Sequence, residues 1–470
     1  MQPTLKLTEV LSALDYSVFF IITLTTIGFV VWGNYKKSNL TSESAKYMDL
    51  MLMGRKLTLP MFIATLVATW YGGIFGVSQI AFEHGIFNFI TQGLFWYITY
   101  IIFAFFILKK IKRYDAVTLP DLVGQMFGPK SEKVAAIFNI FNLIPIVYTI
   151  SIGLLLKMIF GLEFEVSMAI GILFVLSYSF IGGFRSVVYS DIFQFFIMLS
   201  AVVGVVIISY TTFGAEILST LPKSYFSPLS TFSLTETLVW GFIALSTLVD
   251  PNFYQRAFAA KNFDVAKKGI IISTAIWIIF DFSLTFGAMY ARAVIPEAGS
   301  ENGYFIYALQ LLPNGLKGFF LAGICATILS TLDSYLFLAA STVSYDLVPK
   351  RLKGKIKIHH LSLLSVALIS FIMASVFEGN IKNVWKSLGS ISSAAMLVPI
   401  LVGHIFPKKI SDNNFIISSL SGAIATVYWR LSGLKYQLNL DELYIGMGVT
   451  SLMLVILIFG KKFSFSAKTK

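Results

Sequence analysis

Apolar segments long enough to cross a lipid bilayer recur along the whole of this 470-residue chain. A transmembrane helix needs about 20 consecutive, mainly apolar residues. Thirteen stretches meet that description and are numbered here as spans 0 to 12: 13–32, 58–82, 88–108, 134–158, 166–182, 187–212, 235–254, 269–291, 316–345, 360–378, 382–404, 414–430 and 441–460. We therefore expect an all-α polytopic membrane protein with about 13 transmembrane helices.

The composition also indicates a bilayer rather than water as the solvent. Apolar residues make up 56% of the chain and charged residues 13%, whereas a soluble chain carries about 25% charged residues. Because a single hydrophobic core stops growing at about 250–300 residues, the excess apolar surface must face lipid. A soluble enzyme is excluded.

Basic residues gather on one side of the predicted membrane. With the N-terminus outside, 27 of the 36 Lys and Arg residues fall in the inside segments 33–57, 109–133, 183–186, 255–268, 346–359, 405–413 and 461–470. Since positive charge marks the cytoplasmic side, we expect an N-out, C-in topology. The net charge of +12 then reflects topology and attraction to anionic lipid, and no nucleic-acid partner is expected.

The rest of the sequence predicts no second domain, so residues 1–470 are expected to form a single transmembrane domain. The N-terminus lacks the small-residue cleavage site of a signal peptide. Cys325 is the only cysteine, which rules out an intrachain disulfide. The four histidines lack the spacing of a zinc site.

Spans 1 and 6 contain residues that interrupt helices. Gly72 and Gly73 stand in the middle of span 1, where each costs about 1 kcal/mol of helix propensity relative to alanine. They indicate either a close helix contact through Gly72 and Gly76 or an unwound segment that faces a cavity. Asp250-Pro251 in span 6 indicates either a helix end at the cytoplasmic surface or a second interruption. Interruptions in corresponding helices of two inverted halves point to a transporter's binding site.

Span 8 carries a stripe of hydroxyl groups. Thr327, Ser330, Thr331 and Ser334 recur at helical spacing on an apolar helix, and Asp333 lies at the edge of the stripe. Hydroxyls that bond back to their own helix explain the first four residues. A buried carboxylate is expensive in a membrane and marks a functional site. We therefore favour a site for a dehydrated monovalent cation.

Two further acids lie within predicted spans. Asp281 is central in span 7 and is a functional candidate, whereas Asp191 in span 5 is also compatible with the membrane interface. Span 10 has residues that suit either a cavity wall or helix packing: Trp385, Ser387, Ser390, Ser392 and Ser393.

Four segments resemble motifs of the sodium/solute symporter family, in the same order along the chain. They are ATWYGG at 68–73, GGFRSVVYSDIFQ at 182–194, DPNFYQRAFAAKN at 250–262 and LSTLDS at 329–334. The resemblance covers roughly residues 55–460. It implies a leucine-transporter-like fold with a five-plus-five inverted repeat. The parts would be an additional N-terminal helix at 13–32, repeats at 58–212 and 235–404, and two C-terminal helices at 414–460.

The resemblance also implies sodium as the coupling ion. Carried over to this chain, the ligands of the family's main sodium site are the carbonyls of Ala68, Tyr71 and Thr327 and the hydroxyls of Ser330 and Thr331. Some members bind a second sodium, for which the matching residues are Asp191, Asp333 and Ser334.

We expect the solute at the helix interruptions. The candidate residues are Thr69, Trp70, Gly72, Gly73, Asp250, Asn252, Asp281 and Trp385. ATWYGG looks most like choline-type members, Trp70 and Trp385 suit cation–π contact with a quaternary ammonium, and Asp250 and Asp281 suit an amine. The alternative is that these aromatic residues only pack at the bilayer. The prediction is a sodium-coupled symporter that imports an amine-bearing or zwitterionic solute, amino acid or choline-like, by alternating access.

Two other functions stay open at this stage. A proton-coupled symporter would use Asp333 or Asp191 as its titrating group, and a non-transporting sensor would bind sodium without flux. No catalytic constellation supports an enzyme. The expected partners are the solute, sodium ions and membrane lipids, and the expected location is the plasma membrane, of the bacterial inner-membrane type.

Overall fold

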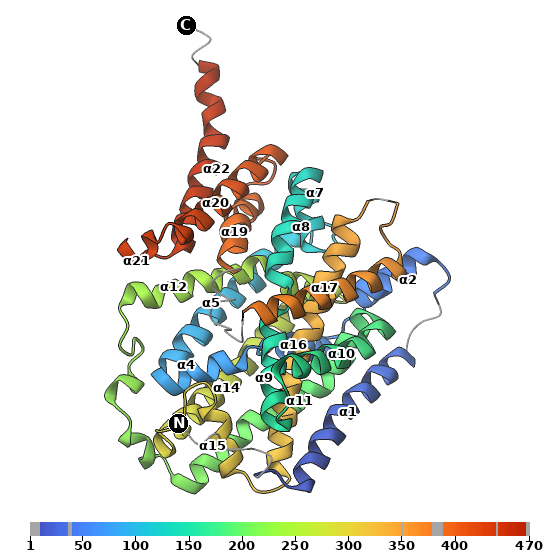
Figure 1. Cartoon of the computed structure of the whole chain (residues 1–470). Coiled ribbons are helices and arrows are strands. Elements are labelled where there is room, and N and C mark those ends of the chain that lie inside the picture. The colour runs from blue at the N-terminus through green and yellow to red at the C-terminus, as the bar shows by residue number, and fades with distance from the viewer. Residues whose placement is uncertain (1–9, 36–39, 350, 378–388, 439, 467–470) are drawn as a thin grey trace.

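Helices make up most of the computed structural model, which describes residues 10–35, 40–349, 351–377, 389–438 and 440–466 (Figure 1). Those up to Phe213 are α1 (Ala13–Tyr35), α2 (Glu43–Leu52), α3 (Leu59–Ala68), α4 (Ile74–His84), α5 (Phe95–Ile102), α6 (Leu108–Ile111), α7 (Leu119–Phe127), α8 (Pro129–Leu143), α9 (Ile146–Phe160), α10 (Phe164–Gly182) and α11 (Phe184–Phe213). Those after it are α12 (Leu234–Ala244), α13 (Pro251–Ala259), α14 (Phe263–Val294), α15 (Gly303–Leu311), α16 (Leu316–Ser341), α17 (Ile356–Val376), α19 (Ser390–Ile405), α20 (Asp412–Leu431), α21 (Leu434–Leu438) and α22 (Glu442–Ser466). Short 3-10 segments lie at Met53–Arg55, Glu216–Thr220, Lys223–Phe226 and Leu245–Val249, and π-helical segments at Phe89–Leu94, Phe103–Ile107 and Thr342–Leu347.

Each of the thirteen predicted spans contains helix within the described residues. In the same part of the chain, nine helices are long and apolar enough to cross a membrane by length and composition. The difference has physical reasons. Spans 1 and 6 are divided into shorter helices, the described helix of span 10 begins only at Ser390, and the helix of span 11 carries more polar residues.

Both predicted helix interruptions lie inside the bundle. α3 ends at Ala68 and α4 begins at Ile74, which confirms an unwound segment in span 1. In span 6 the chain becomes extended at Asp250, and a new helix, α13, begins at Pro251. The Asp250 carboxylate accepts a 2.7 Å hydrogen bond from the Asn252 backbone N–H and caps this helix. Because α13 is almost entirely buried, the alternative of a helix end at the cytoplasmic surface is wrong.

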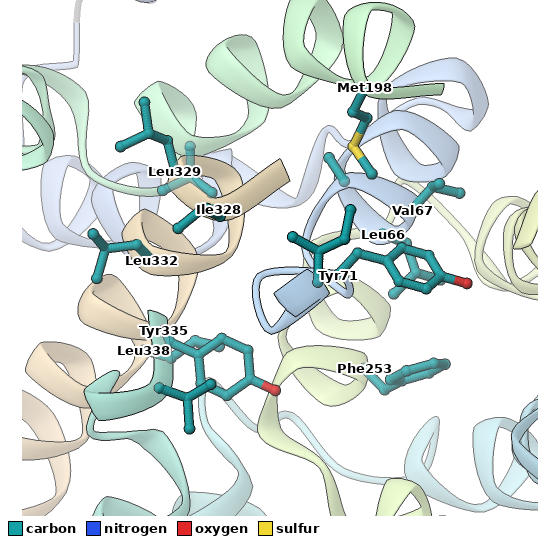
Figure 2. Packing of buried hydrophobic residues seen from close by; sticks show 14 of the residues in the cluster. Leu66, Val67, Tyr71, Met198, Phe253, Ile328, Leu329, Leu332, Tyr335 and Leu338 are labelled. Atoms are coloured by element: carbon teal, nitrogen blue, oxygen red, sulfur yellow. The ribbon is translucent and has the colours of Figure 1, made fainter. Parts of the chain in front are cut away.

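The centre of the bundle is α16, whose apolar window is entirely buried, whereas only 22% of the apolar window of α1 is buried. α16 packs against α1, α11 and α17. Figure 2 shows Ile328, Leu329 and Leu332 of α16 on one side of this core and Leu66 and Val67, next to the interruption in span 1, on the other. The oxygen-bearing stripe of span 8 is therefore held deep in the protein rather than at its lipid surface.

On the predicted cytoplasmic side, the ends of the two interrupted spans are joined. Leu57, just before α3, forms a parallel β-bridge with Ala260, just after α13. Beside them, Asp49 of α2 and Arg185 of α11 form a buried ion pair with a 2.7 Å N–O distance. The bridge holds together the ends of the two interrupted spans, and the ion pair joins α2 to α11.

We predict that Asp49→Ala destabilises the protein by about 3–5 kcal/mol, because it leaves the Arg185 guanidinium buried without its partner. Asp115→Ala is the matched control, since it removes an ion pair of similar length with Arg55, at 2.6 Å, in which the aspartate side chain is 90% exposed. That control should cost less than about 1 kcal/mol. Thermal unfolding of the purified variants measures both changes, and equal losses would contradict the structural role of the Asp49–Arg185 pair.

Candidate functional site

The two interrupted helices meet each other. The Asn252 side-chain amide, at the start of α13, lies 3.4 Å from the Thr69 carbonyl oxygen, to which it donates a hydrogen bond. The rings of Trp70 and Phe253 are in edge contact, with their centroids 6.0 Å apart. Backbone groups freed by the interruptions are thus directed at other parts of the protein, as membrane burial requires.

Four of the five residues predicted for the main sodium site gather where α3 ends against α16, namely Ala68, Thr327, Ser330 and Thr331. The Ser330 hydroxyl donates to the Ala68 carbonyl oxygen over 2.7 Å. The same hydroxyl and that of Thr331 lie 3.2 and 3.1 Å from the Thr327 carbonyl oxygen. Gly72, next to Tyr71, packs so closely on Thr331 that an added Cβ would lie 2.6 Å from the Thr331 Cβ. This concentration of carbonyl and hydroxyl oxygens suits a hard monovalent cation.

The hydroxyls of the stripe make two kinds of contact. Thr327 bonds back to the Gly323 carbonyl and Thr331 to the Thr327 carbonyl, as polar residues in apolar helices commonly do. Ser330 makes a similar contact with the Thr327 carbonyl and also reaches across to Ala68 at the end of α3. A hydroxyl that donates its hydrogen retains lone pairs on its oxygen, so these contacts do not remove its ability to bind a cation.

The residues predicted for a second sodium are also close together, and all are buried. Asp191 accepts a 2.5 Å hydrogen bond from Thr65. Asp333 accepts hydrogen bonds of 2.8 and 3.1 Å from Tyr178 and Ser190. The second carboxylate oxygens of both aspartates, Oδ1, have no hydrogen-bond partner within the described part of the chain. Unpartnered oxygens of this kind can accept a cation or a proton.

Arg256 is the residue of this site that sequence reasoning missed. It counts among the basic residues of the predicted inside segment 255–268, but its side chain is fully buried. Its guanidinium donates to the hydroxyls of Thr65, Thr69 and Ser334 over 2.9, 2.6 and 3.0 Å, and to the Asn252 side-chain oxygen. It also lies 3.7 Å from an Asp191 carboxylate oxygen. The signal for it was indirect, since two carboxylates inside a membrane protein require a cationic partner.

A cavity of about 1060 Å³ opens beside the interruption in span 1. It is bounded by α4, α5, α12 and the ends of α19 and α22, and aromatic rings form much of its wall. Ser390 and Ser393 line it, as predicted for span 10. Its acidic residues are Glu83, Glu236 and Asp441, and neither lysine nor arginine occurs among the described residues of its wall. Such a cavity favours positively charged or zwitterionic molecules over anions.

The predicted solute residues divide into two groups. Trp70 and Gly73 line the cavity. The others within the described residues are structurally engaged in its surroundings: Thr69 and Asn252 bind Arg256, Asp250 caps α13, Gly72 packs against Thr331 and Tyr148, and Asp281 accepts hydrogen bonds from Tyr71 and Tyr97. Trp385 lies outside the described residues.

Two solved structures match this fold over nearly their whole length. A Na⁺-coupled sialic acid symporter in a substrate-bound, outward-open state superposes with a TM-score of 0.77 at 16% identity, covering 95% of this chain and 96% of that one. Mhp1, a nucleobase-cation-symport-1 family transporter, gives a TM-score of 0.51 at 11% identity and covers 88% and 93%. At these identities the likeness establishes the fold alone, which is leucine-transporter-like.

Sequence comparison leads to a family. The osmoregulated proline transporter of Bacillus subtilis is 26% identical over 360 residues, 71% of this chain and 72% of its own length. The sodium/proline symporter of Staphylococcus aureus is 24% identical over 472 residues, covering 92% and 89%. The model of the sodium:solute symporter family matches residues 50–422. The family predicted from the four motifs is therefore confirmed: this multi-pass membrane protein belongs to the sodium:solute symporter family, whose members are transporters and not enzymes.

Proposed function

We propose that this protein imports a small amine-bearing or zwitterionic solute together with sodium across a bacterial plasma membrane. The main support is the contact between the interruption in span 1 and the hydroxyls of α16, where the Ser330 hydroxyl meets the Ala68 carbonyl. The proposed ligands are the five residues of the main sodium site named above. In this proposal residues 58–212 and 235–404 are inverted repeats, the N-terminus is outside, and the bundle that holds the interrupted helices rocks against the rest.

The electrochemical gradient would supply the driving force. Moving one sodium ion inward across about 100 mV releases about 2.3 kcal/mol. A tenfold sodium gradient adds about 1.4 kcal/mol. One coupled sodium ion then sustains a few-hundredfold accumulation of solute, and a second would square that ratio. The number of sodium ions coupled to each solute molecule therefore depends on the charge of the Asp191–Asp333 cluster.

Charge balance supports one further cation beside Arg256. Asp191 and Asp333, if both are ionised, carry two negative charges, and the guanidinium of Arg256 supplies one positive charge. The remaining negative charge lies at the two buried Oδ1 atoms, which have no hydrogen-bond partner among the described residues. A second sodium bound with Ser334 would restore neutrality, and a proton on either carboxylate is the alternative that a proton-coupled symporter would use.

The cavity supports the class of solute. Trp70, Trp96 and Trp240 are among its wall residues, and tryptophan is the strongest cation–π partner. The acidic residues of the wall add negative potential. Two of the relatives are named for proline, which carries both an amine and a carboxylate. An amino acid or a choline-like molecule fits these features better than an uncharged sugar or a simple carboxylate.

The first prediction concerns the main sodium site. Sodium at 100 times its dissociation constant should stabilise the protein by about 2.7 kcal/mol, at constant ionic strength with potassium as the replacement. The double variant Ser330→Ala/Thr331→Ala should lose this increment, because it removes both hydroxyl ligands. Ser341→Ala is the matched control, since it lies on the same helix about 16 Å away and its buried hydroxyl has no partner among the described residues.

Thermal unfolding across sodium concentrations measures this increment. If the stability of the double variant still rises with sodium concentration, the ion binds at a site other than Ser330 and Thr331. Stabilisation that follows pH and not sodium would favour the proton-coupled alternative.

The second prediction concerns Arg256. Arg256→Gln should destabilise the protein by about 3–5 kcal/mol, because it leaves buried carboxylates without their cation. Adding Asp191→Asn in the same chain should recover much of the loss, since one unbalanced charge is removed. Chemical or thermal unfolding in potassium compares the two variants. A double variant no more stable than Arg256→Gln would argue against charge pairing as the role of this arginine.

The third prediction concerns the solute. In proteoliposomes with an inward sodium gradient, radiolabelled L-proline or choline should accumulate above equilibrium, whereas glucose and acetate should not. Liposomes that contain the Ser330→Ala/Thr331→Ala protein are the control. Accumulation of only glucose or only acetate would refute the proposed solute class, and sodium binding without flux of any of the four would favour a sensor.

A further inference from the structure

Tyr71 connects three parts of the protein from within the unwound segment between α3 and α4. Tyr71 lines the cavity, and its carbonyl is one of the proposed sodium ligands. Its hydroxyl donates a 2.7 Å hydrogen bond to Asp281 of α14. In Figure 2 this hydroxyl points away from α16, so the side chain and the sodium-binding hydroxyls lie on different sides of the segment.

Asp281 is held on both sides by tyrosines. One carboxylate oxygen accepts from Tyr71 and the other from Tyr97 of α5. Tyr97 follows the π-helical segment Phe89–Leu94, a kind of irregularity often found at functional sites. Asp281 is 1% exposed, and both of its oxygens are occupied by these phenols. It is thus arranged to hold tyrosine side chains, and its link to the cavity runs through the Tyr71 ring.

The unwound segment needs such restraints, because the regular helical hydrogen bonds stop at Ala68 and resume at Ile74. The Tyr71 ring stacks on Phe280 of α14, with centroids 4.0 Å apart and an angle of 21° between the planes. Together with the charge-assisted hydrogen bond to Asp281, this stacking fixes Tyr71 against α14. A carbonyl on a fixed residue is a preorganised ligand, which binds an ion with less ordering of the chain.

We propose that Asp281 is a positioning residue for the main sodium site, acting through Tyr71 and not by contact with the solute. By holding the Tyr71 hydroxyl, it sets the direction of the Tyr71 carbonyl toward the ion and places the Tyr71 ring in the cavity wall. Sodium binding and solute binding then depend on the same side chain. This inference rests on the proposed function, because it assumes that sodium binds at Ala68, Tyr71 and α16.

The test uses the purified full-length protein with sodium itself as the probe. Tyr71→Phe keeps the ring and the carbonyl but removes the hydrogen bond to Asp281. It should raise the sodium concentration for half-maximal thermal stabilisation about tenfold, since a hydrogen bond to a charged group is worth about that factor. Asp281→Asn, a second route to the same weakening, should shift the sodium dependence in the same direction.

Tyr100→Phe is the matched control. Tyr100 is buried in the same aromatic cluster, but its hydroxyl has no hydrogen-bond partner among the described residues. This variant should leave the sodium dependence unchanged. A purely structural role for Tyr71 would lower stability equally in sodium and in potassium, without a change in the half-maximal sodium concentration, and that result would overturn the proposal.

The two levels of inference fail in different ways. If sodium stabilises the wild type and Tyr71→Phe with the same half-maximal concentration, the positioning role is refuted and the sodium site stands. If sodium does not stabilise the wild type at all, the proposed function is contradicted, and the role of Asp281 falls with it.

Discussion

The structure depends on how backbone groups are satisfied where two helices are interrupted inside a membrane protein. Away from water, an unpaired carbonyl or N–H costs several kcal/mol. At the first interruption the Ala68 carbonyl is met by the Ser330 hydroxyl, and at the second the Asp250 carboxylate caps the new helix α13. The Ala68 carbonyl and the hydroxyls of α16 are thereby concentrated in one place, and the sodium proposal is built on these oxygen atoms.

The second constraint is that buried negative charges need a cationic partner, and Arg256 is that partner. Its guanidinium contacts hydroxyls on α3, at the first interruption and on α16, and it lies beside Asp191 of α11. The planar group offers five donors in a fixed geometry, which lysine cannot reproduce. The arginine therefore connects α13 with α3, α11 and α16. A change in the charge of Asp191 or Asp333 would act on Arg256 and, through it, on the start of α13.

Local sequence signals identified the features that depend on local chemistry. Gly72-Gly73 and Asp250-Pro251 marked both interruptions as one of two interpretations, because glycine and proline act on their own stretch of backbone. The stripe on α16 was visible for the same reason, since helical spacing alone brings its hydroxyls to one face. The motifs, through family resemblance, associated that stripe with Ala68, and the structure brings Ser330 and Ala68 together.

Features that arise from packing between distant segments could not be derived in this way. Arg256 looked like a cytoplasmic charge, because nothing in its neighbourhood shows that α13 stays within the bundle. Asp281 was predicted as a solute residue. Its contacts with Tyr71 and Tyr97 could not be foreseen, because they join α14 to residues 210 and 184 positions away. The count of thirteen spans also differs from the number of long helices. An interrupted span is apolar enough to cross a membrane, but each of its helices is too short to be counted as a membrane-spanning helix.

The central claim is that the oxygen atoms between the first interruption and α16 bind sodium. Equilibrium binding of radioactive sodium to the purified protein tests it most directly, with unlabelled sodium or potassium as the competitor. The account predicts saturable binding that unlabelled sodium displaces and equimolar potassium does not. Absence of saturable binding, or equal displacement by potassium, would contradict it.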